Sequence, residues 1–82
     1  MLTEELLIKQ CRKGKRDAQE ELYNRFAAAM LGVCMRYCSH RAEAEDLLQE
    51  GFIKVFRNIY DFKPKNEGSL AAWIKRIMVN TA

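Results

Sequence analysis

The sequence is poor in the residues that break helices or cross-link chains. Its 82 residues include one proline, four glycines and three cysteines. So little proline and glycine excludes collagen-like repeats and Pro-rich linkers, and a hydrophobic content of 49% excludes a disordered tail. An odd number of cysteines without a disulfide framework predicts reduced thiols. We therefore expect one small folded domain in a reducing compartment.

Long apolar runs are also missing. No stretch approaches the roughly 18 residues of a membrane span. The N-terminal segment MLTEELLIKQ carries acids where a signal peptide carries a basic start. We expect a cytoplasmic protein with no membrane insertion.

Charge is small in sum but unevenly distributed. The formal net charge is +3, with eight Lys and Arg against nine Asp and Glu in residues 1–51, and six against two in residues 52–82. The second part therefore favours an anionic partner such as nucleic acid. An ordinary surface is the alternative, because many domains of this charge bind no anion.

Apolar residues recur at helical spacing along the whole chain, and no alternating strand pattern persists. The fold class predicted is all-α, a compact bundle of three to four antiparallel helices joined by short loops. We expect the helices over residues 4–13, 17–38, 42–60 and 70–82, with a loop over 61–68.

Helix starts and stops carry further signals. Asp17 and Glu20 resemble a capping box, and Ser69 is placed to cap the last helix. No terminating signal closes that helix before Ala82. We therefore expect residues 1–82 to be a single domain taken from a longer protein.

The third helix has two distinct faces. Its apolar arc must face the core. The opposite arc is mostly polar but includes an isoleucine, and Leu47 lies beyond its edge. This arc is either a protein-docking surface or a solvated face with one stray isoleucine. Its members are Asp46, Gln49, Glu50, Ile53 and Arg57.

The fourth helix separates an apolar side from one that carries Lys75, Arg76 and Asn80. Cations offset phosphate charge and an amide can donate to and accept from a base edge, so this side suits nucleic acid. The loop before it adds an aromatic and small polar groups that could hold an unpaired base. Phe62 could equally fold into the core, and the side could be an ordinary surface. The loop candidates are Phe62, Asn66 and Ser69.

Residues for catalysis or metal binding are scarce. Cys34, Cys38 and His40 have metal-ligand chemistry, but the fourth ligand could only be Cys11. Buried free thiols are the commoner outcome. Because no phosphate loop or zinc-protease motif is present, we expect no metal, no cofactor and no enzymatic activity.

Several ordered blocks resemble region 2 of bacterial sigma factors of the sigma-70 family, specifically the extracytoplasmic-function (ECF) group. The resemblance covers nearly the whole chain, including an opening block with LIKQCRKG at 7–14. The other blocks are AEDLLQEGFIKVF at 44–56, YDF at 60–62 and AWIKRIMVNTA at 72–82.

The resemblance implies a transcription initiation module with two contact surfaces. In the family, the acidic and amide face of the third helix docks on the clamp helices of the largest subunit of RNA polymerase, which implies this role for Asp46, Gln49 and Glu50, with Ile53 and Arg57 as neighbours. The loop and fourth helix of the family recognise the minus-ten promoter element as melted non-template strand. The residues implied there are Phe62, Asn66, Ser69, Lys75, Arg76 and Asn80.

Two departures limit what the resemblance implies. The loop between Phe62 and Trp73 is longer than the usual family form, so promoter preference is not inherited. We also expect these 82 residues not to include the family's second promoter-binding domain. Alternative functions are a helical adaptor that binds only protein, such as polymerase or an anti-sigma factor, and a duplex-reading helix-turn-helix regulator.

Overall fold

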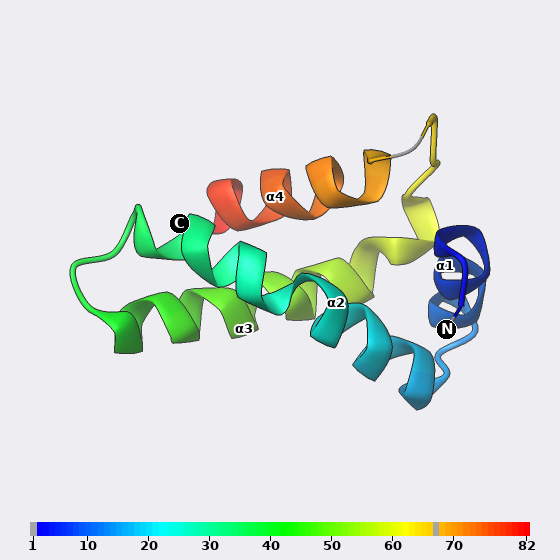
Figure 1. Cartoon of the computed structure of the whole chain (residues 1–82), viewed down its shortest axis with the longest axis horizontal. Coiled ribbons are helices and arrows are strands. Elements are labelled where there is room, and N and C mark those ends of the chain that lie inside the picture. Colours follow the sequence, from blue (N-terminus) through cyan, green and yellow to red (C-terminus); the bar gives the residue numbers. More distant parts are fainter. Residues whose placement is uncertain (1, 67) are drawn as a thin grey trace.

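The computed structural model describes residues 2–66 and 68–82, and these residues form a helical bundle without strands (Figure 1). The all-α class predicted from the sequence is confirmed. The elements are α1 (Glu4–Arg12), α2 (Arg16–Met35), α3 (Arg41–Asn58), the 3₁₀ turn η1 (Ile59–Asp61) and α4 (Ser69–Thr81).

The start of α1 follows the sequence signals, whereas the start of α2 does not. Thr3 caps α1, because the Leu6 backbone N–H donates to Thr3 Oγ1 at 3.2 Å. The prediction of a capping box at Asp17 is wrong, since Lys15 is the N-cap of α2 and makes no side-chain cap bond. Gly14 has a φ of +74°, so the chain reverses there and α2 begins before Asp17 can act as a cap.

Helix α2 ends at Met35, earlier than the apolar pattern indicates. The N–H groups of Arg36 and Tyr37 donate to the carbonyls of Val33 and Cys34, at 3.1 and 3.0 Å. These bonds span three residues, so the α-helix tightens and stops. Cys38 stays half-buried in the connection to α3.

The core lies where α2, α3 and α4 meet, with α1 packed on α2 and η1. Leu47 is buried, with 8% of its surface exposed. The prediction that it lies outside the core-facing arc of α3 is therefore wrong. Helix α3 packs against both α2 and α4, and its apolar arc is therefore wider than a single neighbour would require. The largest fully buried side chains include Leu7, Leu22, Ile59, Leu70, Ile74 and Met78.

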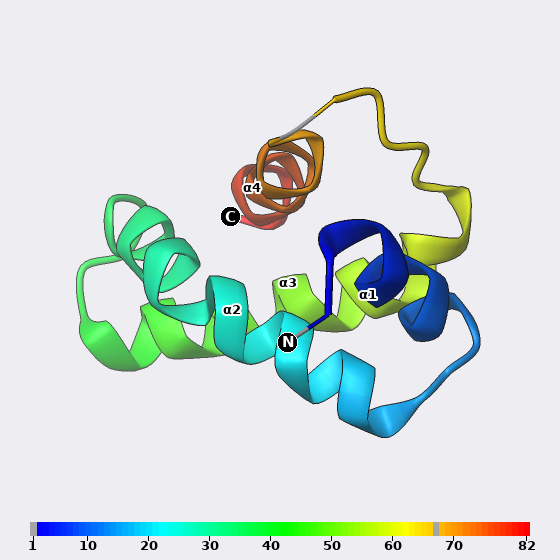
Figure 2. The same cartoon turned by 45° about the vertical axis from the view of Figure 1, so that its right-hand side comes forward.

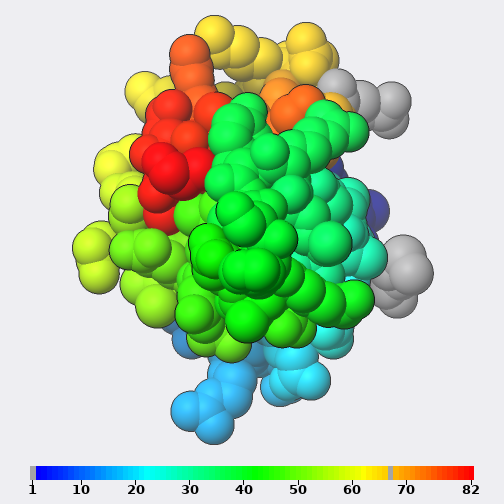
Figure 3. Space-filling view, turned by 90° about the vertical axis from the view of Figure 1, so that its left-hand side faces the viewer, coloured from blue at the N-terminus to red at the C-terminus, as the bar shows by residue number. Residues whose placement is uncertain are grey.

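The two ends of the bundle differ in what they bring together. At one end, α1 lies beside η1 and the loop that leads to α4 (Figures 1 and 2). At the other end, the C-terminal residues of α4 lie beside the segment that joins α2 to α3 (Figure 3). Among the residues described, no helix is both long and apolar enough to cross a membrane.

Candidate functional site

A surface hollow lies between the loop after η1 and the outer side of α4. Its volume of about 560 Å³ is within the range of small-molecule sites. Three residues expected to contact DNA line it, namely Phe62, Ser69 and Arg76. The remaining lining residues are Asp61, Lys63, Lys65, Ala72 and Trp73.

Two stacked aromatic rings form one wall of the hollow. The ring centroids of Phe62 and Trp73 are 4.8 Å apart, with an interplanar angle of 32°. Phe62 is only 5% exposed, so of its two possible roles the structure favours packing into the core. Trp73 is half-buried and keeps part of its ring at the surface. The wall is therefore fixed from beneath by Phe62.

Ser69 holds the loop before α4 but does not cap the helix. Ser69 is the first residue of α4, and the N-cap is Gly68, whose φ of +85° favours glycine. Ser69 Oγ accepts from the backbone N–H groups of Lys65 and Asn66, at 3.2 and 3.0 Å, and donates to Asn66 Oδ1 at 3.0 Å. The prediction that Ser69 caps α4 is therefore wrong. The Asn66 side chain closes the turn and does not line the hollow.

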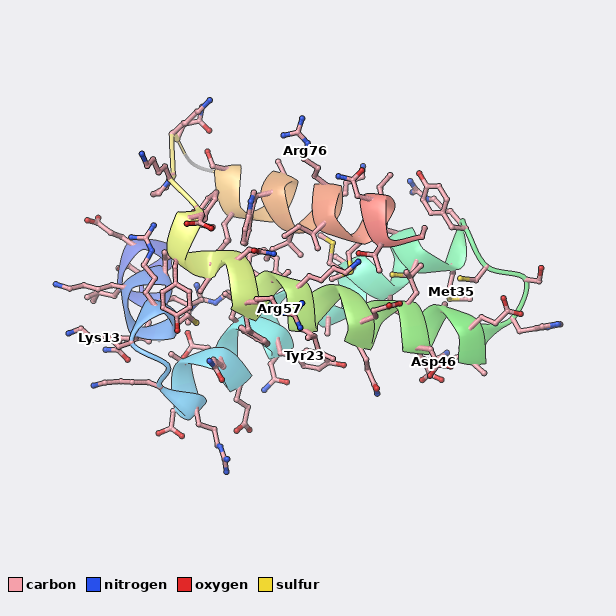
Figure 4. All side chains as sticks on the ribbon, turned by 180° about the vertical axis from the view of Figure 1, so that it is seen from behind. Lys13, Tyr23, Met35, Asp46, Arg57 and Arg76 are labelled. Carbon is pink, nitrogen blue, oxygen red and sulfur yellow. The ribbon has the colours of Figure 1, made fainter. Side chains whose placement is uncertain are left out.

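Charged side chains surround the opening of the hollow. Lys63, Lys65 and Arg76 supply three cations and Asp61 supplies one carboxylate, and all four residues are exposed. Arg76 extends away from α4 into solvent (Figure 4). Within residues 2–66 and 68–82, none of these four groups takes part in an ion pair. The hollow thus combines aromatic surface, positive charge and hydrogen-bonding groups.

The outer side of α4 extends this site along the helix. Ser69, Trp73, Arg76 and Asn80 follow one another at steps of three or four residues, so they share one side. Asn80 is exposed one turn beyond Arg76. Lys75 is also exposed but lies off this line and does not line the hollow.

A second exposed stripe runs along α3. Its five members are spaced by three or four residues, and all of them are exposed. Ile53 is 58% exposed, although it is aliphatic. Asp46 points away from α3 on the side of the molecule opposite Arg76 (Figure 4). The α3 stripe consists of Asp46, Gln49, Glu50, Ile53 and Arg57.

Two smaller hollows flank the first turns of the α3 stripe. One, of about 250 Å³, lies between α2 and α3 and includes Tyr23 and Gln49. The other, of about 280 Å³, lies between α3 and the C-terminal turn of α4 and includes Asp46, Glu50 and Tyr37. A partner surface could therefore place side chains on both sides of the stripe.

Two of the three cysteines, Cys11 and Cys34, are buried, whereas Cys38 is half-buried and lines the hollow beside Asp46 and Glu50. Burial raises the pKa of the Cys11 thiol to about 11, with a smaller contribution from the Glu21 carboxylate. Burial also raises the pKa of Cys34, with the Cys38 thiol as a lesser cause. In the described part of the chain, no three His, Cys, Asp or Glu side chains are grouped as a metal site requires. Cys11 and Cys34 are therefore packing residues of the core.

The family model for Sigma-70 region 2 matches residues 22–82. The chain belongs to this family. It is 36% identical, over 99% of its length, to the ECF RNA polymerase sigma-E factor of Haemophilus influenzae. It is 34% identical, over 89% of its length, to the ECF RNA polymerase sigma factor SigW of Bacillus subtilis. The resemblance to ECF sigma factors predicted from the sequence is confirmed.

The relatives are longer than this region 2 domain. The RNA polymerase sigma-H factor of Pseudomonas aeruginosa is 32% identical over the whole chain, and the match covers 43% of that protein. The corresponding shares of the Haemophilus and Bacillus proteins are 41% and 38%. The chain thus spans about two fifths of the length of these relatives.

Sequence reasoning left some lining residues of the region 2 hollow without an assigned role. Asp61 and Trp73 were not expected to contact a ligand. No local signal could have found Asp61, because the burial of its neighbour Phe62 follows only from the fold. Asp61 ends η1 and Lys63 follows Phe62, so both exposed residues flank a core residue at the hollow.

Proposed function

We propose that this domain joins RNA polymerase to promoter DNA in a transcription initiation factor that catalyses no reaction itself. The observation that carries the proposal is the placement of two different exposed surfaces on one bundle. The α3 stripe offers carboxylates, an amide and an aliphatic side chain. The hollow at α4 offers aromatic surface and cations, and Asp46 and Arg76 point to opposite sides of the molecule (Figure 4). One domain can therefore hold a protein and a nucleic acid at once.

The α3 stripe would dock on the clamp helices of the largest polymerase subunit. Exposed Ile53 supplies apolar contact, and Asp46 and Glu50 supply charge that orients a basic partner. The flanking hollows could accept side chains from a two-helix partner. This arrangement supports helix-on-helix docking of the kind that the family resemblance implies.

The hollow at α4 would take an unpaired base from the melted non-template strand of the minus-ten element. The exposed part of Trp73 offers a stacking surface, and the carboxylate of Asp61 can accept from a base edge. Ser69 would hold the turn beside the base, because its hydroxyl already bonds Lys65 and Asn66. Lys63, Lys65 and Arg76 would offset phosphate charge. Unstacking a base costs a few kcal/mol, and these contacts would offset that cost.

An anti-sigma factor is a further partner that we propose on the same grounds. A protein that covers the α3 stripe would block polymerase without touching the hollow. A helical adaptor that binds only protein is the competing function, and salt-dependent binding of single-stranded DNA would count against it.

The first test is a calorimetric titration of the domain with the isolated clamp helices. We expect micromolar binding, and we expect Asp46→Ala to weaken it about tenfold, or about 1.4 kcal/mol. Glu20→Ala is the matched control, because Glu20 is also an exposed carboxylate but belongs to α2 and is not a member of the stripe. Absence of binding by the folded domain, or equal losses in both variants, would contradict the proposed docking surface.

A further inference from the structure

Arg12, on the last turn of α1, reaches across to the backbone that begins the DNA-facing loop. Its Nε donates to the Ile59 carbonyl at 3.2 Å, and its Nη2 donates to the Phe62 carbonyl. The Arg12 side chain is partly buried in this contact. Figures 1 and 2 show α1 beside η1, and Figure 4 marks Lys13, the neighbour of Arg12, at the same end of the molecule.

The end of η1 leaves carbonyl groups that its own segment satisfies only in part. Carbonyl groups at a helix end lack partners within the helix, and a cation is favoured there by the helix dipole. The last turn of η1 contains no basic residue. The Ile59 carbonyl accepts the Phe62 N–H at 3.3 Å and the Arg12 Nε–H as well. The planar guanidinium suits this site because two of its nitrogens can bond two carbonyls at once.

The bonded carbonyls stand directly before the hollow. Phe62 directly follows η1, its buried ring stacks on Trp73, and Lys63 follows it into the loop. A guanidinium that fixes the Ile59 and Phe62 carbonyls therefore fixes the direction in which the chain leaves η1. It also fixes the ring that supports Trp73.

We propose that Arg12 is a positioning residue for the nucleic-acid hollow, acting through the backbone of Ile59 and Phe62. The part of this proposal that concerns DNA rests on the function proposed above. Arg12 lies outside residues 22–82, which the family model matches, so the first helix of this chain would contribute to DNA capture without touching DNA.

The test compares Arg12→Met and Arg12→Lys with Arg25→Met in the full 82-residue chain. Arg25 is the matched control, because it is also partly buried and its Nη2 donates to a backbone carbonyl, that of Leu2, at 2.6 Å. Trp73 is the single tryptophan of the chain, so its emission and its quenching by acrylamide report on the hollow without any ligand. The second readout is binding of labelled single-stranded oligo(dA), oligo(dC) and oligo(dT) of about 12 nucleotides over a range of salt.

We expect Arg12→Met to increase quenching of Trp73 and to weaken oligonucleotide binding about tenfold. Arg12→Lys keeps the charge but loses the planar fork, so we expect an intermediate effect. Because Arg12 is not a phosphate contact, the slope of affinity against salt should stay that of the wild type. Arg25→Met should change neither readout.

Each contrary result has a distinct meaning. Unchanged Trp73 quenching and affinity in a folded Arg12→Met domain would overturn the proposal, and so would a salt slope reduced by about one, which indicates a direct phosphate contact. If Arg12→Met does not fold by circular dichroism, Arg12→Lys decides the question by the same criteria. If the wild type binds no oligonucleotide, the proposed function fails, while Trp73 quenching still decides whether Arg12 positions the hollow.

Discussion

The Met78 thioether of α4 lies against Gly51 of α3, in the space that a Cβ atom at residue 51 would occupy. Met78 is only 1% exposed, so its side chain has little room to move away. Gly51 therefore sets how closely α4 approaches α3. Since α4 carries Arg76 and α3 carries Asp46, this contact also sets the separation of the two proposed binding surfaces.

Replacing Gly51 by alanine should lower the free energy of unfolding by about 1 kcal/mol. Alanine in a helix interior gains about 1 kcal/mol over glycine, but overpacking a core costs about 1 to 3 kcal/mol. Displacement of the buried Met78 should outweigh the gain. Urea denaturation followed by circular dichroism measures the difference.

Gly32 of α2 offers the matched comparison. It is exposed, and a Cβ there would meet nothing within 4 Å, apart from its own helix and chain neighbours. Gly32→Ala should therefore raise the free energy of unfolding by about 1 kcal/mol. Equal stabilisation by both substitutions would mean that Met78 moves aside at little cost and that Gly51 does not limit the helix approach.

Local patterns were enough to predict the helices, because each signal acts within one or two turns. Helix α1 begins at Glu4 as predicted, and the apolar spacing places α3 and α4 to within a few residues. Leu47 was misplaced, since a helical projection does not reveal how many neighbours cover a helix. Its burial follows from the packing of α3 against both α2 and α4, which is a tertiary property.

The site was predicted in part for the same reason. The α3 stripe lies on one regular helix, so sequence spacing alone brings its members together. The hollow depends instead on contacts between distant segments. Arg12 bonds the Phe62 carbonyl across 50 residues, and no local pattern indicates that bond. The Asn66 side chain accepts a hydrogen bond from Ser69 within the turn, and its contact with a base stays a prediction.

Ile53→Ser should weaken binding to the clamp helices about tenfold while leaving the fold intact. Ile53 is 58% exposed, so its removal costs the core little, whereas a protein partner would bury it. Gln49→Ala should act in the same direction. Binding of single-stranded DNA should not change in either variant. Equal losses of DNA and clamp binding would contradict the division into two surfaces.

Asn80→Ala and Lys75→Ala should change DNA binding in different ways. Asn80 lies on the line of α4 that leads from the hollow, so its loss should reduce discrimination among bases. Lys75 lies off that line, so its loss should weaken all strands alike and reduce the salt slope by about one. Fluorescence anisotropy with oligonucleotides that differ at one position separates the two effects. An unchanged base preference in Asn80→Ala would remove Asn80 from the site.

The domain should become less stable as pH rises from 9.0 to about 11 because of Cys11. Burial raises the pKa of this thiol from its ordinary 9.0 to about 11, so across this range the unfolded chain loses a proton that the folded chain keeps. Deprotonation thus favours unfolding, and the stabilisation present below pH 9.0 should fall by about 2 kcal/mol. Cys11→Ala should show a shallower decline, with a remainder from Cys34, whose pKa is also raised. Urea titrations across this pH range measure how the free energy of unfolding changes with pH in the wild type and in Cys11→Ala. Identical slopes in the two proteins would show that Cys11 does not titrate as its burial requires.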